Sequence, residues 1–185
     1  RSRGLGDVYK RQAVDIRPLW PDYLTESDFE HDFPYNLKLK AHQGPKAKKT
    51  DEMETYYSVT YPIKAQSVKF ITAIILKDSP ASKNIPQVTR LKGDDLQGVR
   101  IAKGDKITDV YLNTRADGHI MHRNSCTNVN GWDTDAYLLA FSYKKGTDPA
   151  VSKNILEWFI GYGSYVRNAH ESIFDSYTKK YKVIR

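Results

Sequence analysis

Short runs in which apolar and polar residues alternate, broken by turn residues, recur along most of the chain. In residues 35–43, YNLKLKAHQ, the apolar Leu37 and Leu39 alternate with polar side chains, which is typical of a strand with one buried face. Residues 67–76 become apolar on both faces in their second half, which predicts a central strand covered on both sides. The pattern therefore predicts a chain built mainly from strands.

Further strands are predicted wherever this pattern repeats between turn residues. Gly93 and Gly104 are each followed by aspartate, and such pairs are typical of tight turns between strands. The further predicted strands are 55–61, 87–91, 98–102, 107–113, 118–123, 136–143, 155–163, 164–168, 171–176 and 180–184. Only residues 151–158 could form a short helix. The sequence thus predicts a single all-β domain over residues 13–185, either an antiparallel β-sandwich or a two-layer jelly-roll-like pair of sheets.

The first residues of the chain, RSRGLGDVYKRQ, do not follow this pattern. Residues 7–12 match the translation of the codons GAT GTG TAT AAG AGA CAG, which belong to a transposase sequencing adapter. We therefore interpret residues 1–12 as an artefactual, disordered leader and exclude them from the fold. On this interpretation the natural protein extends upstream of Ala13, and any export signal would lie in that part.

Charge and composition narrow the range of partners. The formal net charge is +7, and removing the four basic residues and one acidic residue of the leader lowers it to +4. A mildly basic domain suits an acidic ligand but does not argue for nucleic acid. No apolar run approaches the roughly 18 residues of a membrane span. We therefore expect neither a nucleic-acid partner nor a membrane partner.

The stretch with the most candidate chemistry is residues 117–143, DGHIMHRNSCTNVNGWDTDAYLLAFSY. His119 and His122 are three residues apart, so in an extended chain they point to opposite faces and do not form a chelating pair. The single cysteine has no CxxC partner, and we expect neither a metal nor another cofactor. A polar loop at 124–131 leads to Trp132 and can present hydrogen-bond donors and an aromatic face to a sugar. It can equally be a hairpin connection with polar turn residues.

Three other titratable residues each have a functional and a plainer interpretation. Asp133 and Asp135 share a strand face, so they could form a carboxylate pair or a cation site, or simply a solvated strand end. His42 lies on the polar face of its strand and could meet a substrate, or be a hydrogen-bonded surface residue. We assign no catalytic residue and no metal ligand among them.

Charged and aromatic clusters are open to two interpretations as well. A basic cluster could attract a polyanionic glycan or only solubilise an edge strand; its members are Lys38, Lys40, Lys46, Lys48 and Lys49. Trp158, Tyr162 and Tyr165 have the composition of a sugar-stacking platform, but the alternation of Trp158 with Ile160 favours burial. Cys126 lies in a polar loop with no evident base, which argues against a nucleophile, and one cysteine leaves the redox compartment open.

Several segments follow one another in a recognisable order. They are SVKFITAIIL (67–76), PQVTRLKGDDLQGVRIAKGDKITDVYLN (86–113), ADGHIMHRN (116–124), TDAYLLAFSY (134–143), FIGYGSYVRNAHESIFDS (159–176) and KYKVI (180–184). This succession is similar to the C-terminal β-sheet region of the heparinase II/III-like polysaccharide lyases. The resemblance covers most of residues 56–184.

The resemblance implies an α/α-toroid ahead of the sheet region and cleavage of acidic polysaccharides by β-elimination. In that reaction a base removes the C5 proton of a uronate, and an acid, often tyrosine, protonates the departing glycosidic oxygen. The family's catalytic residues lie on the toroid and on an early strand of the sheet region. No position of this chain matches them, so none is carried over. The resemblance implies a bacterial, periplasmic or secreted enzyme of which this chain alone is inactive.

On this basis we expect the chain to be an accessory sheet domain that supports the missing N-terminal α/α-toroid. It would line the cleft for the acidic polysaccharide through His119, His122, Arg123, Asn124 and Trp132. Two alternatives stay open. One is an independent carbohydrate-binding β-sandwich, marked by an exposed aromatic row; the other is a structural interaction module, marked by an apolar patch near residues 13–35.

Overall fold

The computed structural model describes residues 13–20, 38–46, 53–60, 70–79, 82–93, 95–115 and 126–185. Regular structure in these residues is almost entirely strand, which confirms the predicted all-β fold. The strands are β1 (Ala13–Trp20), β2 (Lys38–Lys46), β3 (Met53–Thr60), β4 (Ile71–Lys77), β5 (Gln87–Lys92), β6 (Leu96–Lys103), β7 (Lys106–Asn113), β8 (Thr127–Val129), β9 (Trp132–Thr134), β10 (Leu138–Lys144), β11 (Ile155–Arg167) and β12 (Ser172–Ile184).

The chain divides into two compact units. One consists of Arg1–Ile16 with Ala73–Arg185, and the other is Arg17–Thr72. Strands β2 and β3 form an antiparallel two-stranded ladder in the second unit, and β1 pairs with β4. The expectation of one domain over residues 13–185 stays a prediction, and the leader at 1–12 lies outside the described residues.

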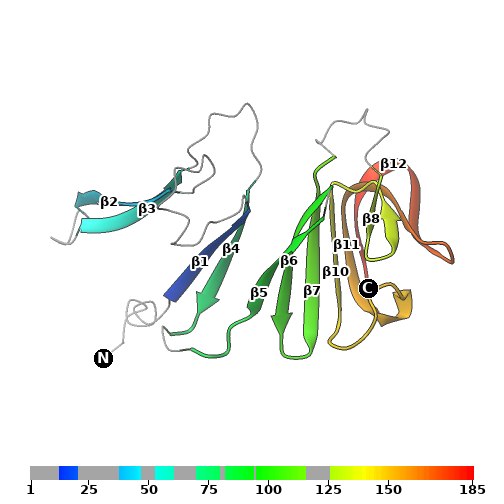
Figure 1. The fold of residues 1–185 in the computed structure, drawn as a ribbon, viewed down its shortest axis with the longest axis horizontal. Coiled ribbons are helices and arrows are strands. Elements are labelled where there is room, and N and C mark those ends of the chain that lie inside the picture. Colours follow the sequence, from blue (N-terminus) through cyan, green and yellow to red (C-terminus); the bar gives the residue numbers. More distant parts are fainter. Residues whose placement is uncertain are drawn as a thin grey trace, which may run out of the picture. The chain divides into compact units, whose positions relative to one another are not determined.

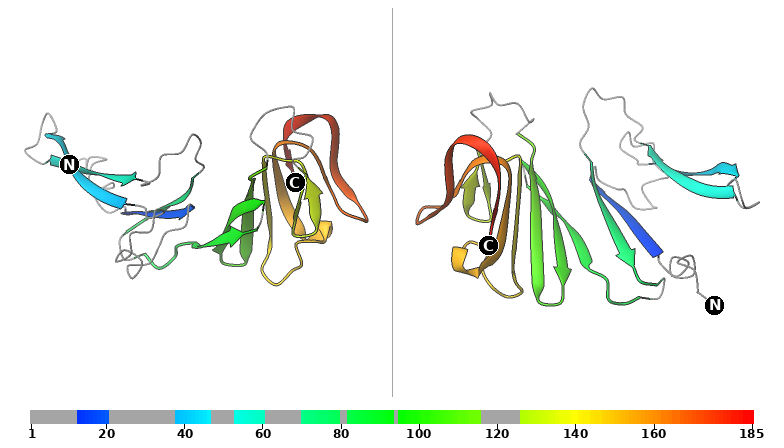
Figure 2. Two further views of the ribbon diagram at one scale, coloured as in Figure 1. Left: turned by 45° about the horizontal axis from the view of Figure 1, so that its top comes forward. Right: turned by 180° about the vertical axis from the view of Figure 1, so that it is seen from behind.

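Eight strands of the first unit form one antiparallel sheet. Its order is β5-β6-β7-β10-β11-β9-β8, and β12 also pairs with β11. Figure 1 shows β5, β6, β7, β10 and β11 following one another across the sheet, and the view from behind in Figure 2 shows β12 curving over its far end. The sheet curls into a half-barrel, which is the sandwich-like character that the sequence predicted.

The hairpin between β6 and β7 fixes the register of this sheet. Lys103 lies opposite Lys106, so the connection is the two-residue turn Gly104-Asp105, and Gly104 has φ +60°. Glycine adopts this left-handed backbone without the steric cost that a Cβ would bring. The turn predicted from the Gly-Asp pair is confirmed, and it places Arg100 directly opposite Asp109.

The core lies on one face of the sheet and is rich in aromatic side chains. Phe141 of β10 lies opposite Trp158 of β11, and their rings are 5.2 Å apart. Trp132 of β9 meets Trp158 edge to face at 5.1 Å, a geometry that adds about 0.5–1.5 kcal/mol beyond burial itself. Tyr111 of β7 stacks on Phe141 at 6.0 Å. The strands of the half-barrel are thus held together by one continuous aromatic cluster.

Most predicted strands between residues 87 and 143 are confirmed, with bounds shifted by a few residues. The C-terminal region differs, because β11 and β12 are each one long strand where two were predicted. Their pairing is irregular between Ile160 and Gly163, and Tyr162 has φ +54° there. The possible helix at 151–158 is wrong, since only Ser152–Asn154 form a 3₁₀ turn before β11 begins. The predicted strand 118–123 lies outside the described residues.

Strands β8 and β9 form a tight hairpin within what the sequence indicated as a polar loop. Val129 pairs with Trp132, and the two residues between them, Asn130 and Gly131, have φ +48° and +88°. Positive φ at both central positions is the geometry of a type I′ turn, for which Asn-Gly is the favoured pair. The Asn130 side chain donates to the Tyr111 hydroxyl at 2.8 Å, which ties the hairpin to the core.

Candidate functional site

Four of the five residues predicted to line a substrate cleft lie outside the described residues. They are His119, His122, Arg123 and Asn124. The fifth, Trp132, is fully buried, and its indole N–H donates to the Pro149 carbonyl at 2.8 Å. Trp132 therefore offers no exposed face to a sugar in this structure, and its contacts are those of a core residue.

The carboxylate of Asp135 is held by its own chain. It accepts hydrogen bonds from the Ser164 backbone N–H at 2.7 Å and the Ser164 hydroxyl at 2.6 Å, and Lys179 Nζ lies 3.8 Å away. Asp133 accepts from the Asn128 side chain at 2.8 Å. These bonds stabilise local structure. Within the described ranges, no group of three or more histidine, cysteine, aspartate or glutamate side chains could hold a metal ion.

The remaining candidates from the sequence have different surroundings. His42 Nε2 lies 2.7 Å from the Ser58 hydroxyl, across the β2–β3 ladder. Cys126 is exposed. Trp158 is buried, as its alternation predicted, whereas the Tyr162 ring lies 5.9 Å from that of the exposed Tyr181. Burial, followed by a hydrogen bond with Cys126, raises the pKa of Tyr165, and the Tyr165 backbone N–H donates to the Asp135 carboxylate at 3.3 Å. The structure therefore brings Cys126, Asp135 and Tyr165 together, whereas Trp158 belongs to the core.

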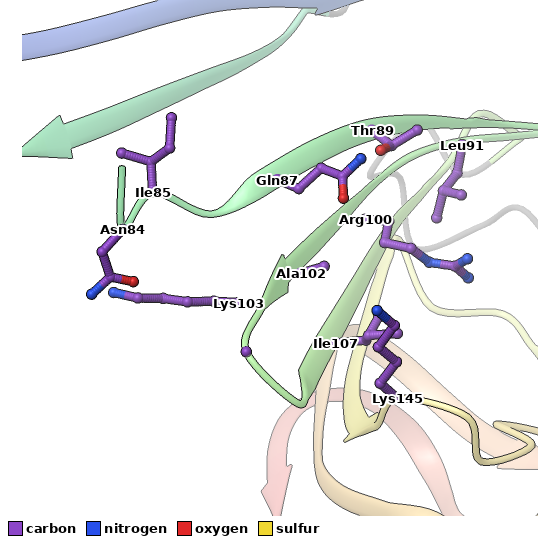
Figure 3. Close-up of a pocket in the computed structure, with 11 residues that line it drawn as sticks. Asn84, Ile85, Gln87, Thr89, Leu91, Arg100, Ala102, Lys103, Ile107 and Lys145 are labelled. Carbon is purple, nitrogen blue, oxygen red and sulfur yellow. The ribbon is translucent and has the colours of Figure 1, made fainter. Parts of the chain in front are cut away.

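A cavity of about 440 Å³ opens on the β5–β6–β7 part of the sheet (Figure 3). Its polar lining residues are Asn84, Gln87, Thr89, Arg100, Lys103 and Lys145, and its apolar lining includes Ile85, Leu91, Ala102 and Ile107. Alternation explains much of this lining: Gln87, Thr89 and Leu91 point to one face of β5, as Arg100 and Ala102 do on β6. The described lining contains three cations and no carboxylate, so the cavity suits an anionic ligand that also carries hydroxyl groups.

Asp109 fixes the guanidinium of Arg100 at this cavity. Arg100 Nε and Nη2 each donate to one carboxylate oxygen of Asp109 at 2.8 Å, a bidentate pair. Asp109 is fully buried and also accepts from the Tyr143 hydroxyl at 2.9 Å. The pKa of Arg100 is raised, first by its hydrogen bonds to Asp109 and further by the charge of that carboxylate.

Because of this ion pair, the three cations that line the cavity have different roles in binding an anion. The charge of Arg100 is balanced by Asp109, while the two bonds to Asp109 use only two of the five guanidinium N–H donors. Arg100 therefore contributes oriented donors more than net charge. Lys103 and Lys145 supply the net positive charge of the lining, because no carboxylate lines the cavity with them.

The raised pKa values of two tyrosines near Asp109 predict that the protein loses stability at alkaline pH. Burial, followed by the hydrogen bond to Asp109, raises the pKa of Tyr143 to about 12 from an ordinary value of 10.0. Burial, followed by the charge of Asp109, raises the pKa of Tyr111 likewise to about 12. Because both folded-state pKa values exceed the unfolded one, this stabilisation is complete below about pH 10 and is lost as pH rises toward 12.

We expect the free energy of unfolding, measured by urea titration, to fall steadily between about pH 10 and pH 12. Tyr143→Phe should show a smaller decline over that interval, because one of the groups with a raised pKa is gone. A free energy that stays level or rises over the same interval would contradict this assignment.

Arg100, Lys103 and Lys145 are not among the site residues predicted from the sequence. One signal was present: an arginine at position 100 sits among the inward-facing positions of a predicted strand, and the Gly104-Asp105 turn places it opposite Asp109. A buried charge pair could have been inferred from that register. Lys145 comes from a connection after β10 and carries no comparable signal.

Comparison with family models and with curated proteins does not assign this chain to a family. No family model matches the chain, and no curated protein matches it either. In the described part of the chain, no helix has the length and apolarity needed to cross a membrane.

Proposed function

We propose that the sheet of the first unit binds a uronate-containing, acidic polysaccharide in the cavity beside Arg100. In this proposal the chain is the accessory C-terminal sheet region of a heparinase II/III-like polysaccharide lyase. The observation that carries the binding proposal is the cationic cavity, with its three basic side chains and no acidic lining residue. The order of sequence segments that resembles the lyases supports the assignment to that family.

The chemistry of the lining suits a uronate. Lys103 and Lys145 would attract the carboxylate, and Arg100 would orient it, because its guanidinium is held in place by Asp109. Thr89, with the amides of Asn84 and Gln87, can exchange hydrogen bonds with sugar hydroxyls. A volume of about 440 Å³ also falls within the range of small-molecule sites.

The same lining argues for binding rather than cleavage. β-Elimination needs a base at the C5 proton and an acid at the departing oxygen. The described lining contains no histidine, tyrosine or carboxylate to take these roles. In the proposed enzyme the toroid would carry out the reaction, and this sheet would hold the substrate chain.

A binding measurement tests the proposal directly. We expect the 185-residue chain to bind digalacturonate in a calorimetric titration. The double variant Lys103→Gln/Lys145→Gln should bind it roughly tenfold more weakly or worse, because each substitution removes one positive charge from the lining. Affinity should also fall with added salt. The chain alone should produce no absorbance from unsaturated uronate.

The matched control carries the same charge change elsewhere. Lys180 and Lys182 are exposed on β12, so Lys180→Gln/Lys182→Gln should bind like the unaltered chain. Equal affinity of all three proteins, or no binding by any of them, would contradict the proposal.

One observation favours the stand-alone carbohydrate-binding alternative. Tyr177 and Tyr181 are exposed on β12, and Tyr181 pairs with the Tyr162 ring. Exposed aromatic side chains at a strand edge can stack on sugar rings, since their apolar faces meet the C–H face of the sugar. The upstream gene distinguishes the two: the lyase requires repeated amphipathic helices before Ala13, whereas the binding module does not.

A further inference from the structure

Strands β1 and β4 pair in a two-stranded ladder that carries four exposed aliphatic side chains (Figure 1). Val14 and Ile16 of β1 are 55% and 57% exposed, and Ile74 and Leu76 of β4 are 65% and 77% exposed. All four residues belong to the first unit. Aliphatic side chains are usually buried, so such a group of exposed ones indicates a surface that another molecule covers.

An ion pair shows that these four side chains share one face of the ladder. Lys77 Nζ lies 3.5 Å from the Asp15 carboxylate, so Lys77 and Asp15 occupy the same face. Successive side chains of a strand point to opposite faces. The four aliphatic residues therefore all lie on the face away from the ion pair, which we call the aliphatic face.

In the described part of the chain, β4 is covered on one side only. Ile75, which shares the face of the ion pair, is 4% exposed, whereas its neighbours Ile74 and Leu76 are exposed. The sequence predicted a strand covered on both sides here. Val14 and Ile16 also fall within residues 13–35, where an apolar patch would mark an interaction module. Both observations indicate that the aliphatic face has a partner.

The charge of the aliphatic face favours a second copy of the chain as that partner. None of the residues that alternation places on this face of the described ladder is charged. A surface that docks on a lipid membrane has lysine and arginine around its apolar residues, and a surface for a charged partner carries the opposite charge. An uncharged face can meet its own copy without repulsion, although the chain as a whole has a net charge of +7.

The area of the aliphatic face fits a reversible dimer. An extended chain exposes about 1.45 Å² per dalton, so at their exposed fractions the four residues present roughly 400 Å². Two copies packed face to face would cover roughly 800 Å² in total, which is less than the 1,200 Å² or so of stable complexes and falls in the range of transient ones. The expected association is therefore weak.

We propose that the chain forms a reversible homodimer in which the aliphatic faces of two copies pack against each other. A twofold axis makes such an interface self-complementary, because the same patch is used on both copies. The side chains would interdigitate as they do between two packed sheets. The inference is independent of the proposed function, since no residue of β1 or β4 lines the cavity.

Sedimentation velocity of the full 185-residue chain tests this proposal. Between roughly 1 and 500 μM the mean sedimentation coefficient should rise from that of a monomer toward that of a dimer, with a midpoint at about 100 μM. Ile74→Lys/Leu76→Lys should weaken dimerisation roughly tenfold or more, because it places like charges against each other on the two copies. The milder Leu76→Thr should weaken it about threefold through lost apolar area, and it keeps the test decisive should the double variant not fold.

The control variant Tyr177→Lys/Val183→Lys makes the same kind of change at exposed residues of β12 and should dimerise like the unaltered chain. An unaltered chain that stays monomeric up to the highest concentration would overturn the proposal. So would a dimer that Ile74→Lys/Leu76→Lys leaves intact, or one that the control variant weakens equally. If phosphatidylcholine vesicles bind the unaltered chain but not Ile74→Lys/Leu76→Lys, the occupant is a lipid surface in place of a second copy, and the proposal is overturned.

Discussion

Asp109→Ala is expected to destabilise the sheet by about 3 kcal/mol, near the lower end of the 3–5 kcal/mol typical of breaking a buried ion pair. The substitution removes both acceptors of the Arg100 guanidinium and the acceptor of the Tyr143 hydroxyl. The Arg100 side chain is 39% exposed, so water can compensate part of its loss, whereas Asp109 is fully buried. Urea unfolding followed by tryptophan fluorescence measures the change, because Trp132 and Trp158 lie in the same core.

Two companion variants separate the ion pair from burial alone. Asp175→Ala removes an exposed carboxylate on β12. Its free energy of unfolding should stay within about 0.5 kcal/mol of that of the unaltered chain. Arg100→Leu/Asp109→Leu replaces the pair with apolar side chains and should be less destabilising than Asp109→Ala, because it leaves no charge without its partner. If the double variant proves the worse of the two, an uncompensated charge on Arg100 is not what destabilises Asp109→Ala.

Gly98→Ala is expected to lower the free energy of unfolding by about 1–3 kcal/mol, because the added methyl group overpacks the sheet. Gly98 is buried in β6, and a Cβ at this position would lie 2.6 Å from the Val110 carbonyl oxygen and 3.0 Å from Tyr111 Cδ1. The carbonyl is part of the β7 backbone and cannot turn aside as a flexible side chain could. Thermal and urea midpoints should both fall, and the strands around the cavity should lose protection from hydrogen exchange first.

Gly93→Ala provides the matched control. A Cβ on Gly93 would have ordinary contacts, the nearest at 3.5 Å from Leu96 Cβ. Alanine also restricts the unfolded chain more than glycine does, so this variant should be neutral or slightly more stable. Equal losses from the two glycines would show that the close approach of β6 to β7 is not the cause.

Local pattern was enough to predict the central hairpins of the sheet. The alternation in residues 98–102 and 107–113 and the Gly104-Asp105 turn each depend on neighbours in sequence, and the structure confirms them as β6 and β7. The β8–β9 hairpin carried an equally local signal in Asn130-Gly131. It was missed because polar residues crowd that stretch, and its strands are only three residues long.

The candidate site depended on contacts that sequence pattern does not encode. Trp132 follows a polar loop, which suggested exposure, yet the indole is buried because β9 folds onto Trp158. The cavity needs the β5–β6–β7 register and the return of the chain after β10 to bring Lys145 near Arg100. Such long-range juxtapositions depend on how the strands pair, and several pairings would satisfy the same alternation.

The C-terminal strand has a consequence for solubility. In the described part of the chain β12 pairs only with β11, so one side of a 13-residue strand has no neighbouring strand to bond. An open strand of this length is a template on which another molecule can add and start aggregation. Exposed Lys180 and Lys182 discourage that addition by mutual repulsion between copies, so acetylation of these lysines would favour assembly into larger, insoluble particles.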